Sequence, residues 1–134
     1  ALRAGRDPAA VTIVAASKTK PVAVLEEALA AGVTDFGENY VQEAETKIAA
    51  LAARGVRPRW HMIGHLQRNK AKRAVELFDV VHTVDDAALG RALDRHAAAR
   101  GVVLPVLVEI NVGGEATKSG VAPGDAAALL AALG

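Results

Sequence analysis

Residues 11–21 read VTIVAASKTKP, an apolar run that ends in a short polar turn. The run from Val11 to Ser17 is rich in β-branched residues, which predicts a strand with both faces buried. The turn from Ser17 to Pro21 contains no glycine. A doubly wound nucleotide-binding sheet ordinarily has a glycine-rich turn after its first strand, because the backbone there approaches a phosphate. This stretch therefore favours a parallel α/β barrel over a doubly wound sheet.

The same strand pattern recurs four more times along the chain. The five runs begin at residues 11, 35, 59, 80 and 105, which are 24, 24, 21 and 25 residues apart. Between them, apolar residues recur at helical spacing, which predicts a parallel sheet covered by helices. The runs are Val11 to Ser17, Asp35 to Glu38, Arg59 to Gly64, Val80 to Val84 and Pro105 to Asn111. Helices are expected from Val22 to near Gly32, Val41 to near Gly55, Gln67 to Leu77, Asp86 to Arg100, and from Pro123 onward.

Polar residues follow every one of these strands, as they do at the functional face of a TIM-type (β/α)8 barrel. They are Lys18, Glu38, Asn39, His61, His65, His82, Glu109 and Asn111. A complete barrel has eight βα units, and this chain supplies about five. We therefore interpret residues 1–134 as the N-terminal part of a single barrel domain, with the C-terminal strands outside this chain. For the same reason, Ala1 to Pro8 is expected to end a preceding helix.

Composition excludes several classes of protein. The 16 basic and 15 acidic residues nearly balance, and four residues are aromatic, so the chain lacks the features of a nucleic-acid binder. The longest uncharged run, Ala126 to Gly134, is too short to span a membrane. The absence of cysteine removes thiolate nucleophiles and disulfides, and it fits a reducing compartment. We expect a cytoplasmic protein.

Lys18 is the most informative polar position. It follows an apolar strand, so its stem is expected to lie in low-dielectric surroundings while its amine reaches the barrel mouth. Such burial favours the neutral amine, which is the form that reacts with an aldehyde to give an imine. The alternative is a lysine that merely extends to solvent at a strand end.

Four segments resemble, in order and spacing, the pyridoxal phosphate homeostasis proteins of the YggS/PROSC type. They read AASKTKP at 15–21, FGENYVQE at 36–43, WHMIGHLQRNK at 60–70 and KSG at 118–120. The resemblance implies an alanine racemase-like barrel of fold type III that binds pyridoxal 5′-phosphate (PLP) as a Schiff base on Lys18. It also implies that Asn39, His61 and Met62 lie beside the cofactor. Asn111, at the end of the fifth strand run, is predicted as a further cofactor-binding residue.

Some of these residues have a structural interpretation as well. Asn39, with Gln42 three residues on, fits a helix N-cap. His61 and His65 are four residues apart but fall in a strand and a loop, so we expect no metal site. Trp60 is expected in the core.

Two other regions carry charge that could be functional. Lys118 lies in the glycine-bearing loop from Val112 to Ala122, where it could accept PLP transiently as a second site or simply pair with Glu115. The basic run Arg68 to Arg73 fits an exposed helix face, and only weakly an RNA- or protein-binding module.

The resemblance implies a PLP carrier with no catalytic residues, one that delivers the cofactor to apo-enzymes that depend on it. PLP enzymes normally need a second acid or base group on the other face of the cofactor. Tyr40, the sole tyrosine, is expected within a βα loop and does not fit that role. In the resembling family the phosphate is held by later strands, so this stretch alone is expected to hold PLP poorly. The alternative function is a PLP-dependent racemase or decarboxylase.

Overall fold

Five parallel strands form one sheet in the computed structural model, which describes residues 1–115 and 117–134. The sheet order is β1-β2-β3-β4-β5, so each strand pairs with the next strand in the sequence. A doubly wound sheet would place a later strand on the far side of β1. The prediction of a barrel-type α/β fold is therefore confirmed. The strands are β1 Val14–Ala16, β2 Asp35–Glu38, β3 Arg59–Met62, β4 Val80–Val84 and β5 Val106–Val108.

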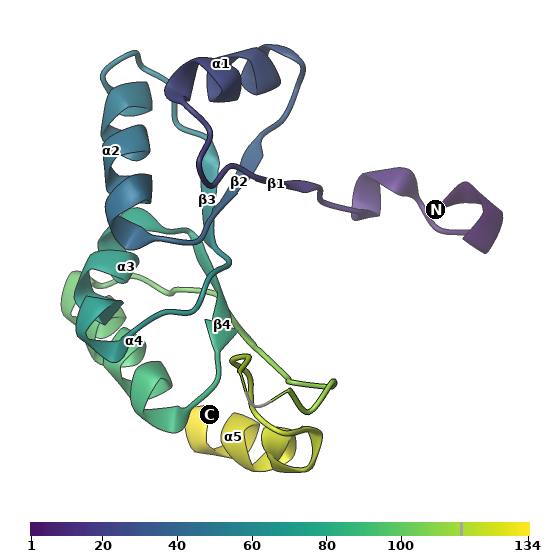
Figure 1. Cartoon of the computed structure of the whole chain (residues 1–134), viewed down its shortest axis with the longest axis vertical. Helices are drawn as coiled ribbons and strands as arrows, with labels where there is room; N and C mark the ends of the chain where they lie inside the picture. Colours follow the sequence, from purple (N-terminus) through teal and green to yellow (C-terminus); the bar gives the residue numbers. More distant parts are fainter. Residues whose placement is uncertain (116) are drawn as a thin grey trace.

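Helices α2, α3 and α4 line one side of the sheet (Figure 1). Each of these three helices contacts the next one along the chain. We call the opposite side of the sheet the open face, because Figure 1 shows none of these three helices on it. The helices are α1 Val22–Ala30, α2 Val41–Ala52, α3 Ala71–Leu77, α4 Ala87–Arg100 and α5 Ala126–Leu133.

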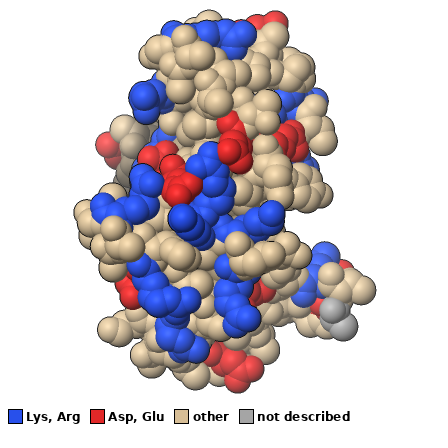
Figure 2. Space-filling view, turned by 90° about the vertical axis from the view of Figure 1, so that its left-hand side faces the viewer, with Lys and Arg blue, Asp and Glu red and all other residues tan. Residues whose placement is uncertain are grey.

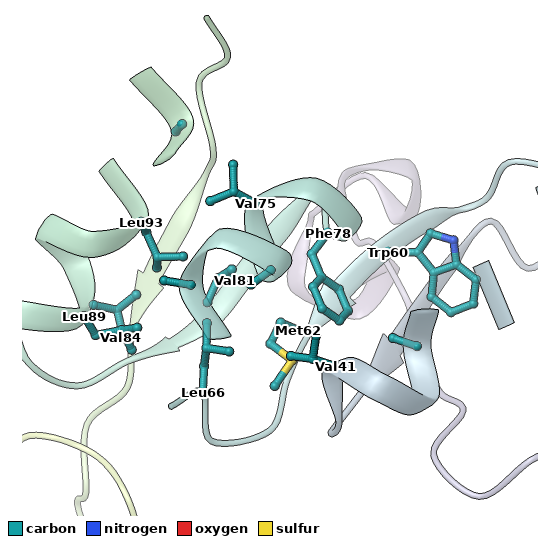
Figure 3. Packing of buried hydrophobic residues seen from close by; sticks show 14 of the residues in the cluster. Val41, Trp60, Met62, Leu66, Val75, Phe78, Val81, Val84, Leu89 and Leu93 are labelled. Atoms are coloured by element: carbon teal, nitrogen blue, oxygen red, sulfur yellow. The ribbon is translucent and has the colours of Figure 1, made fainter. Parts of the chain in front are cut away.

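The core lies between the sheet and the helices, and it is built mainly from alanine, valine and leucine (Figure 3). Two of its few rings, Phe36 and Trp60, pack with their centroids 5.7 Å apart. Trp60 is buried, which confirms its predicted place in the core. Because side chains alternate along a strand, Trp60 and Met62 face the helices while His61 faces the open side. This alternation decides which strand residues are available for a site.

Two predicted helices begin with a tighter turn than expected. A 3-10 turn, Arg68–Lys70, precedes α3, and another, Pro123–Asp125, precedes α5. Such turns are common at helix starts, where the first N–H groups have no partner within the helix. Helix α4 begins and ends as its sequence indicates, with Asp86 accepting from the Leu89 N–H at 2.8 Å and Gly101 in the left-handed region at φ 67°.

The first residues of the chain differ from the prediction. Ala1 to Pro8 does not end a helix; instead, short 3-10 turns form at Leu2–Ala4 and Pro8–Ala10. Gly5 ends the first turn in the left-handed region at φ 64°, and Pro8 has no N–H to continue a helix. This segment is exposed and projects away from the sheet (Figure 1).

Strands β1 and β5 are shorter than predicted, at three residues each. Both lie at the edges of the sheet, where a strand pairs on one side only. The ladder between β4 and β5 also shifts register between Val81 and Val84. In the part of the chain that the structure describes, no helix has the length and apolar character needed to cross a membrane.

Candidate functional site

Lys18 lies in a tight turn directly after β1. The turn is closed by the Lys20 N–H, which donates to the Ser17 carbonyl at 3.0 Å. Thr19 takes the left-handed conformation at φ 63°, which a β-branched residue rarely adopts. The Lys18 side chain is exposed, because the open face beside β1 is uncovered. The prediction that the Lys18 stem is buried is therefore wrong for the described part of the chain. Among the described residues, the Lys18 amine has no hydrogen-bond or ion-pair partner.

A buried lysine from α2 holds this turn. Lys47 Nζ donates to the Ser17 carbonyl, to Glu38 Oε1 and to Glu43 Oε1, each at 2.7 Å. The Lys47 side chain is 6% exposed and that of Glu38 is 0% exposed, so the pair is shielded from water. The Ser17 hydroxyl also donates to Glu38 Oε1 at 2.6 Å. These contacts tie the end of β1 to the end of β2 and to α2.

Glu43 completes this network from the exposed side. Its Oε1 accepts from the Thr19 N–H at 2.6 Å as well as from Lys47. The hydrogen bond from Lys47 is the main cause that lowers the pKa of Glu43, with smaller contributions from the Thr19 N–H and the charge of Lys47, against an opposing effect of burial. Glu43 is therefore an ionised acceptor that fixes the backbone on the far side of Lys18.

Sequence analysis missed Lys47 and assigned Glu38 to the barrel mouth. Lys47 falls three residues after buried Ala44 and four before buried Leu51, so it lies on the apolar stripe of α2. A lysine inside an apolar stripe is the signal that could have revealed it. Glu38 was misplaced because it follows Phe36 by two residues and therefore shares its helix-facing side of β2.

A chain of three polar side chains crosses the open face. His61 Nε2 lies 2.9 Å from Asp35 Oδ1, and His61 Nδ1 lies 2.9 Å from His82 Nε2. The pKa of Asp35 is lowered chiefly by a hydrogen bond from Thr34 and further by His61, against burial. Burial and then the charge of His61 lower the pKa of His82. His61 is therefore held between Asp35 and His82 on the open face.

Asn39 is half-buried after β2 and does not cap α2. The N-cap of that helix is Tyr40, and neither a Tyr40 nor an Asn39 side chain caps it. The backbone of Asn39 instead packs against Gly64, where a Cβ would lie 2.4 Å from the Asn39 carbonyl oxygen. This close approach fixes the loop and leaves the predicted capping box unmade. Asn39 lines a cavity of about 480 Å³ together with Met62, His65 and Lys70.

Met62 lies in the core, and Asn111 lies in the loop after β5. Met62 is 1% exposed and packs among Val41 and Phe78 on the helix side of β3 (Figure 3). Asn111 follows β5, and its Nδ2 donates to the Glu115 carbonyl at 2.9 Å and to the Lys118 carbonyl at 3.4 Å. Met62 thus supports the strand that presents His61, and Asn111 organises the loop after β5.

Three of the remaining basic side chains have ion-pair partners among the described residues, namely Arg54, Arg73 and Lys118. Lys118 Nζ lies 2.7 Å from Glu115 Oε1 on the exposed loop. Arg73, within the basic run, pairs with Glu45 and Glu76. Figure 2 shows the lysine and arginine side chains on the helix-covered side with acidic side chains among them. The charged residues of the basic run Arg68 to Arg73 are exposed or half-buried, which fits a solvated helix surface.

The chain belongs to the family of alanine racemase N-terminal domains, whose model matches residues 3–134. It is 48% identical over 130 residues to the pyridoxal phosphate homeostasis protein of Pseudomonas aeruginosa, a match covering 97% of this chain and 56% of that protein. It is 43% identical over 122 residues to the protein of the same name from Escherichia coli K12, covering 90% of this chain and 52% of that protein. The resemblance carried by the sequence motifs is thus confirmed. The chain spans about half the length of these curated relatives.

Solved structures agree with this placement. PipY of Synechococcus elongatus without PLP matches with a TM-score of 0.86 and 40% identity, over 98% of this chain and 61% of PipY. The PipY structure with PLP bound matches with a TM-score of 0.82 and 42% identity, over 98% of this chain and 60% of PipY. Histidine racemase from Leuconostoc mesenteroides, at 18% identity and a TM-score of 0.68 over 92% of this chain and 33% of that chain, shares the fold alone.

Proposed function

We propose that the protein binds PLP as a Schiff base on Lys18 and serves PLP homeostasis as a carrier, without amino-acid turnover of its own. The observation that carries the proposal is the exposed Lys18 amine, presented by a turn that Lys47 and Glu43 hold. The names of the curated relatives and the PLP-bound PipY structure support the choice of ligand.

The described residues fit the aldehyde end of PLP. When bound, PLP supplies an aldehyde carbon to which a neutral lysine Nζ adds, and a C=N bond forms as the aldehyde oxygen leaves as water. Lys18 is the lysine best placed to react. Lys47 is buried with three acceptors, and Lys118 is paired with Glu115. Lys20 precedes Pro21, which biases its backbone toward an extended conformation and its side chain away from Lys18.

The other four residues predicted to bind the cofactor take different parts in this proposal. His61 faces the open side and Asn39 follows the neighbouring strand, so both are proposed as contacts of the cofactor. Met62 acts from the core by fixing β3, and Asn111 acts by shaping the loop after β5. Each is thus assigned a role that its surroundings permit.

Amino-acid chemistry on PLP requires a second acid or base group on the other face of the cofactor. The carrier proposal rests on the position of Tyr40, which does not fit that role. Tyr40 is 62% exposed at the start of α2, on the loop after β2. The second candidate function is a racemase or decarboxylase. The observation favouring it is the fold shared with histidine racemase, at an identity of 18%.

A carrier of this kind passes PLP to an acceptor, because imine formation is reversible and the Lys18 side chain is exposed. The acceptors we propose are apo-enzymes that use PLP, in the cytoplasm, with neither nucleic acid nor membrane as a partner. The near balance of 16 basic and 15 acidic residues supports the exclusion of nucleic acid.

Borohydride reduction of the full-length protein with PLP, followed by peptide mass mapping, tests the attachment. The pyridoxyl label is expected on Lys18, to be lost in Lys18→Ala and retained in the matched control Lys20→Ala. Label on Lys20 or Lys118 with none on Lys18 would overturn the assignment.

Amino-acid turnover tests the carrier against the enzyme. The full-length protein, assayed with and without added PLP, is expected to racemise or decarboxylate common amino acids far below the ordinary enzyme rate of about 1 per second or more. Turnover in that range, lost in Lys18→Ala, would establish a PLP enzyme instead.

A further inference from the structure

We propose that Glu43 and Lys47 are positioning residues that set the direction and selectivity of Lys18. They act through the backbone on either side of Lys18 and touch neither its amine nor a ligand. This inference rests on the proposed function of Lys18, although the state of the turn can be measured without PLP.

The two residues hold both flanks of Lys18. Lys47 Nζ binds the Ser17 carbonyl at 2.7 Å, and Glu43 Oε1 binds the Thr19 N–H at 2.6 Å. A second bond to the same Ser17 carbonyl, from the Lys20 N–H at 3.0 Å, closes the turn. Each peptide group beside Lys18 is therefore anchored to α2, while the side chain between them stays exposed.

The turn needs such an anchor because its geometry is unfavourable for its sequence. Thr19 is the only non-glycine residue with a positive φ among the described residues. A β-branched side chain in the left-handed region clashes with its own backbone, so surrounding contacts have to hold it there. Glu43 supplies a charge-assisted contact at the Thr19 amide itself, which is stronger than a neutral hydrogen bond.

Burial gives the network its rigidity. Glu38 Oε1 receives both Lys47 Nζ and the Ser17 hydroxyl, so the anchoring lysine is itself fixed by β2. Buried charges cost desolvation and are often replaceable by apolar side chains without loss of stability. Their presence directly beneath an exposed reactive lysine is explained by the orientation that they impose.

The matched pair of variants is Glu43→Ala and Glu45→Ala. Both glutamates lie in α2 and are partly exposed, but Glu45 pairs with Arg73 of α3 rather than with the turn. Two quantities are measured in the full-length proteins: hydrogen exchange of the Thr19 and Lys20 amides without PLP, and the occupancy of pyridoxyl label on Lys18 and Lys20 after borohydride.

Glu43→Ala is expected to speed exchange at Thr19 by at least tenfold, to weaken attachment of PLP to Lys18 by about tenfold, and to raise the share of label on Lys20. Glu45→Ala is expected to resemble the wild type in all three. If Glu43→Ala does not fold, Glu43→Gln, which keeps the size but not the charge, is expected to shift the same readouts less.

The outcomes separate the two proposals. Wild-type protein with no label on Lys18 would refute the proposed function, while the exchange at Thr19 would still test the turn. Label on Lys18 at wild-type occupancy in Glu43→Ala, or unchanged exchange at Thr19, would overturn the positioning role.

Discussion

His61 Nδ1 lies 2.9 Å from His82 Nε2 on the open face of the sheet. With His61 Nε2–H donating to Asp35, a neutral His61 has only its Nδ1 lone pair left to accept, so His82 donates from Nε2. This assignment follows from the hydrogen-bond network. The pair thus has one defined arrangement when both rings are neutral.

Acidification is expected to weaken this arrangement. Burial, followed by the charge of His61, lowers the pKa of His82 below its ordinary 6.5 in the folded protein. As the pH falls through about 6.5, the unfolded chain binds a proton at this residue that the folded chain does not. The free energy of unfolding should therefore be highest above about pH 7 and should decline as the pH falls through 6.5. Urea denaturation at several pH values should show this decline and a shallower one in His82→Gln; equal slopes would contradict it.

Removal of the buried charge in α2 is expected to destabilise the fold strongly. Lys47→Met leaves the Glu38 carboxylate, which is 0% exposed, with the Ser17 hydroxyl as its remaining partner. Breaking such a pair costs about 3–5 kcal/mol, because an uncompensated charge stays buried. The double variant Glu38→Leu/Lys47→Met removes both charges and should recover much of the loss. Chemical denaturation measures both, and a double variant no more stable than Lys47→Met would refute this account.

Relief of the strained turn is expected to stabilise the protein. Thr19→Gly keeps the N–H that donates to Glu43 and removes the side chain that disfavours φ 63°. The gain is about 0.5–1 kcal/mol, since the left-handed penalty exceeds the extra freedom that glycine gives the unfolded chain. Thr12→Gly, at an exposed site without a positive φ, should lower the melting temperature slightly. The opposite order of melting temperatures would show that Thr19 is unstrained.

The loops after β2 and β3 touch at Asn39 and Gly64, and this contact is expected to tolerate no added methyl group. Gly64→Ala would place its Cβ 2.4 Å from the Asn39 carbonyl oxygen and 2.6 Å from the Asn39 Cα. Backbone has to move to make room, at a cost of about 1–3 kcal/mol. Gly124→Ala is the matched control, because its Cβ meets no atom within 4 Å. Equal thermal stability of the two variants would contradict the close packing of the loops.

The sequence predicted the alternation of strands and helices because each element has its own local apolar pattern. The extents of β1 and β5 were overestimated, since pairing on one side only is a property of the sheet and not of the segment. The prediction of Lys18 as the reactive lysine used its position after a strand together with the family resemblance of the AASKTKP segment. Lys47, which anchors the turn, was not predicted, because its burial depends on two acids that the fold brings in from β2 and α2.

The sheet order also bears on how the chain folds. Val14 pairs with Asp35, Asp35 with Arg59, His61 with Val80 and Val81 with Val106, so these ladders join residues 21, 24, 19 and 25 positions apart. The loop-closure entropy is therefore similar for each ladder and never large. A low contact order of this kind lets structure propagate from one βα unit to its neighbour, as in repeat proteins, so that each unit can dock on the preceding one during synthesis.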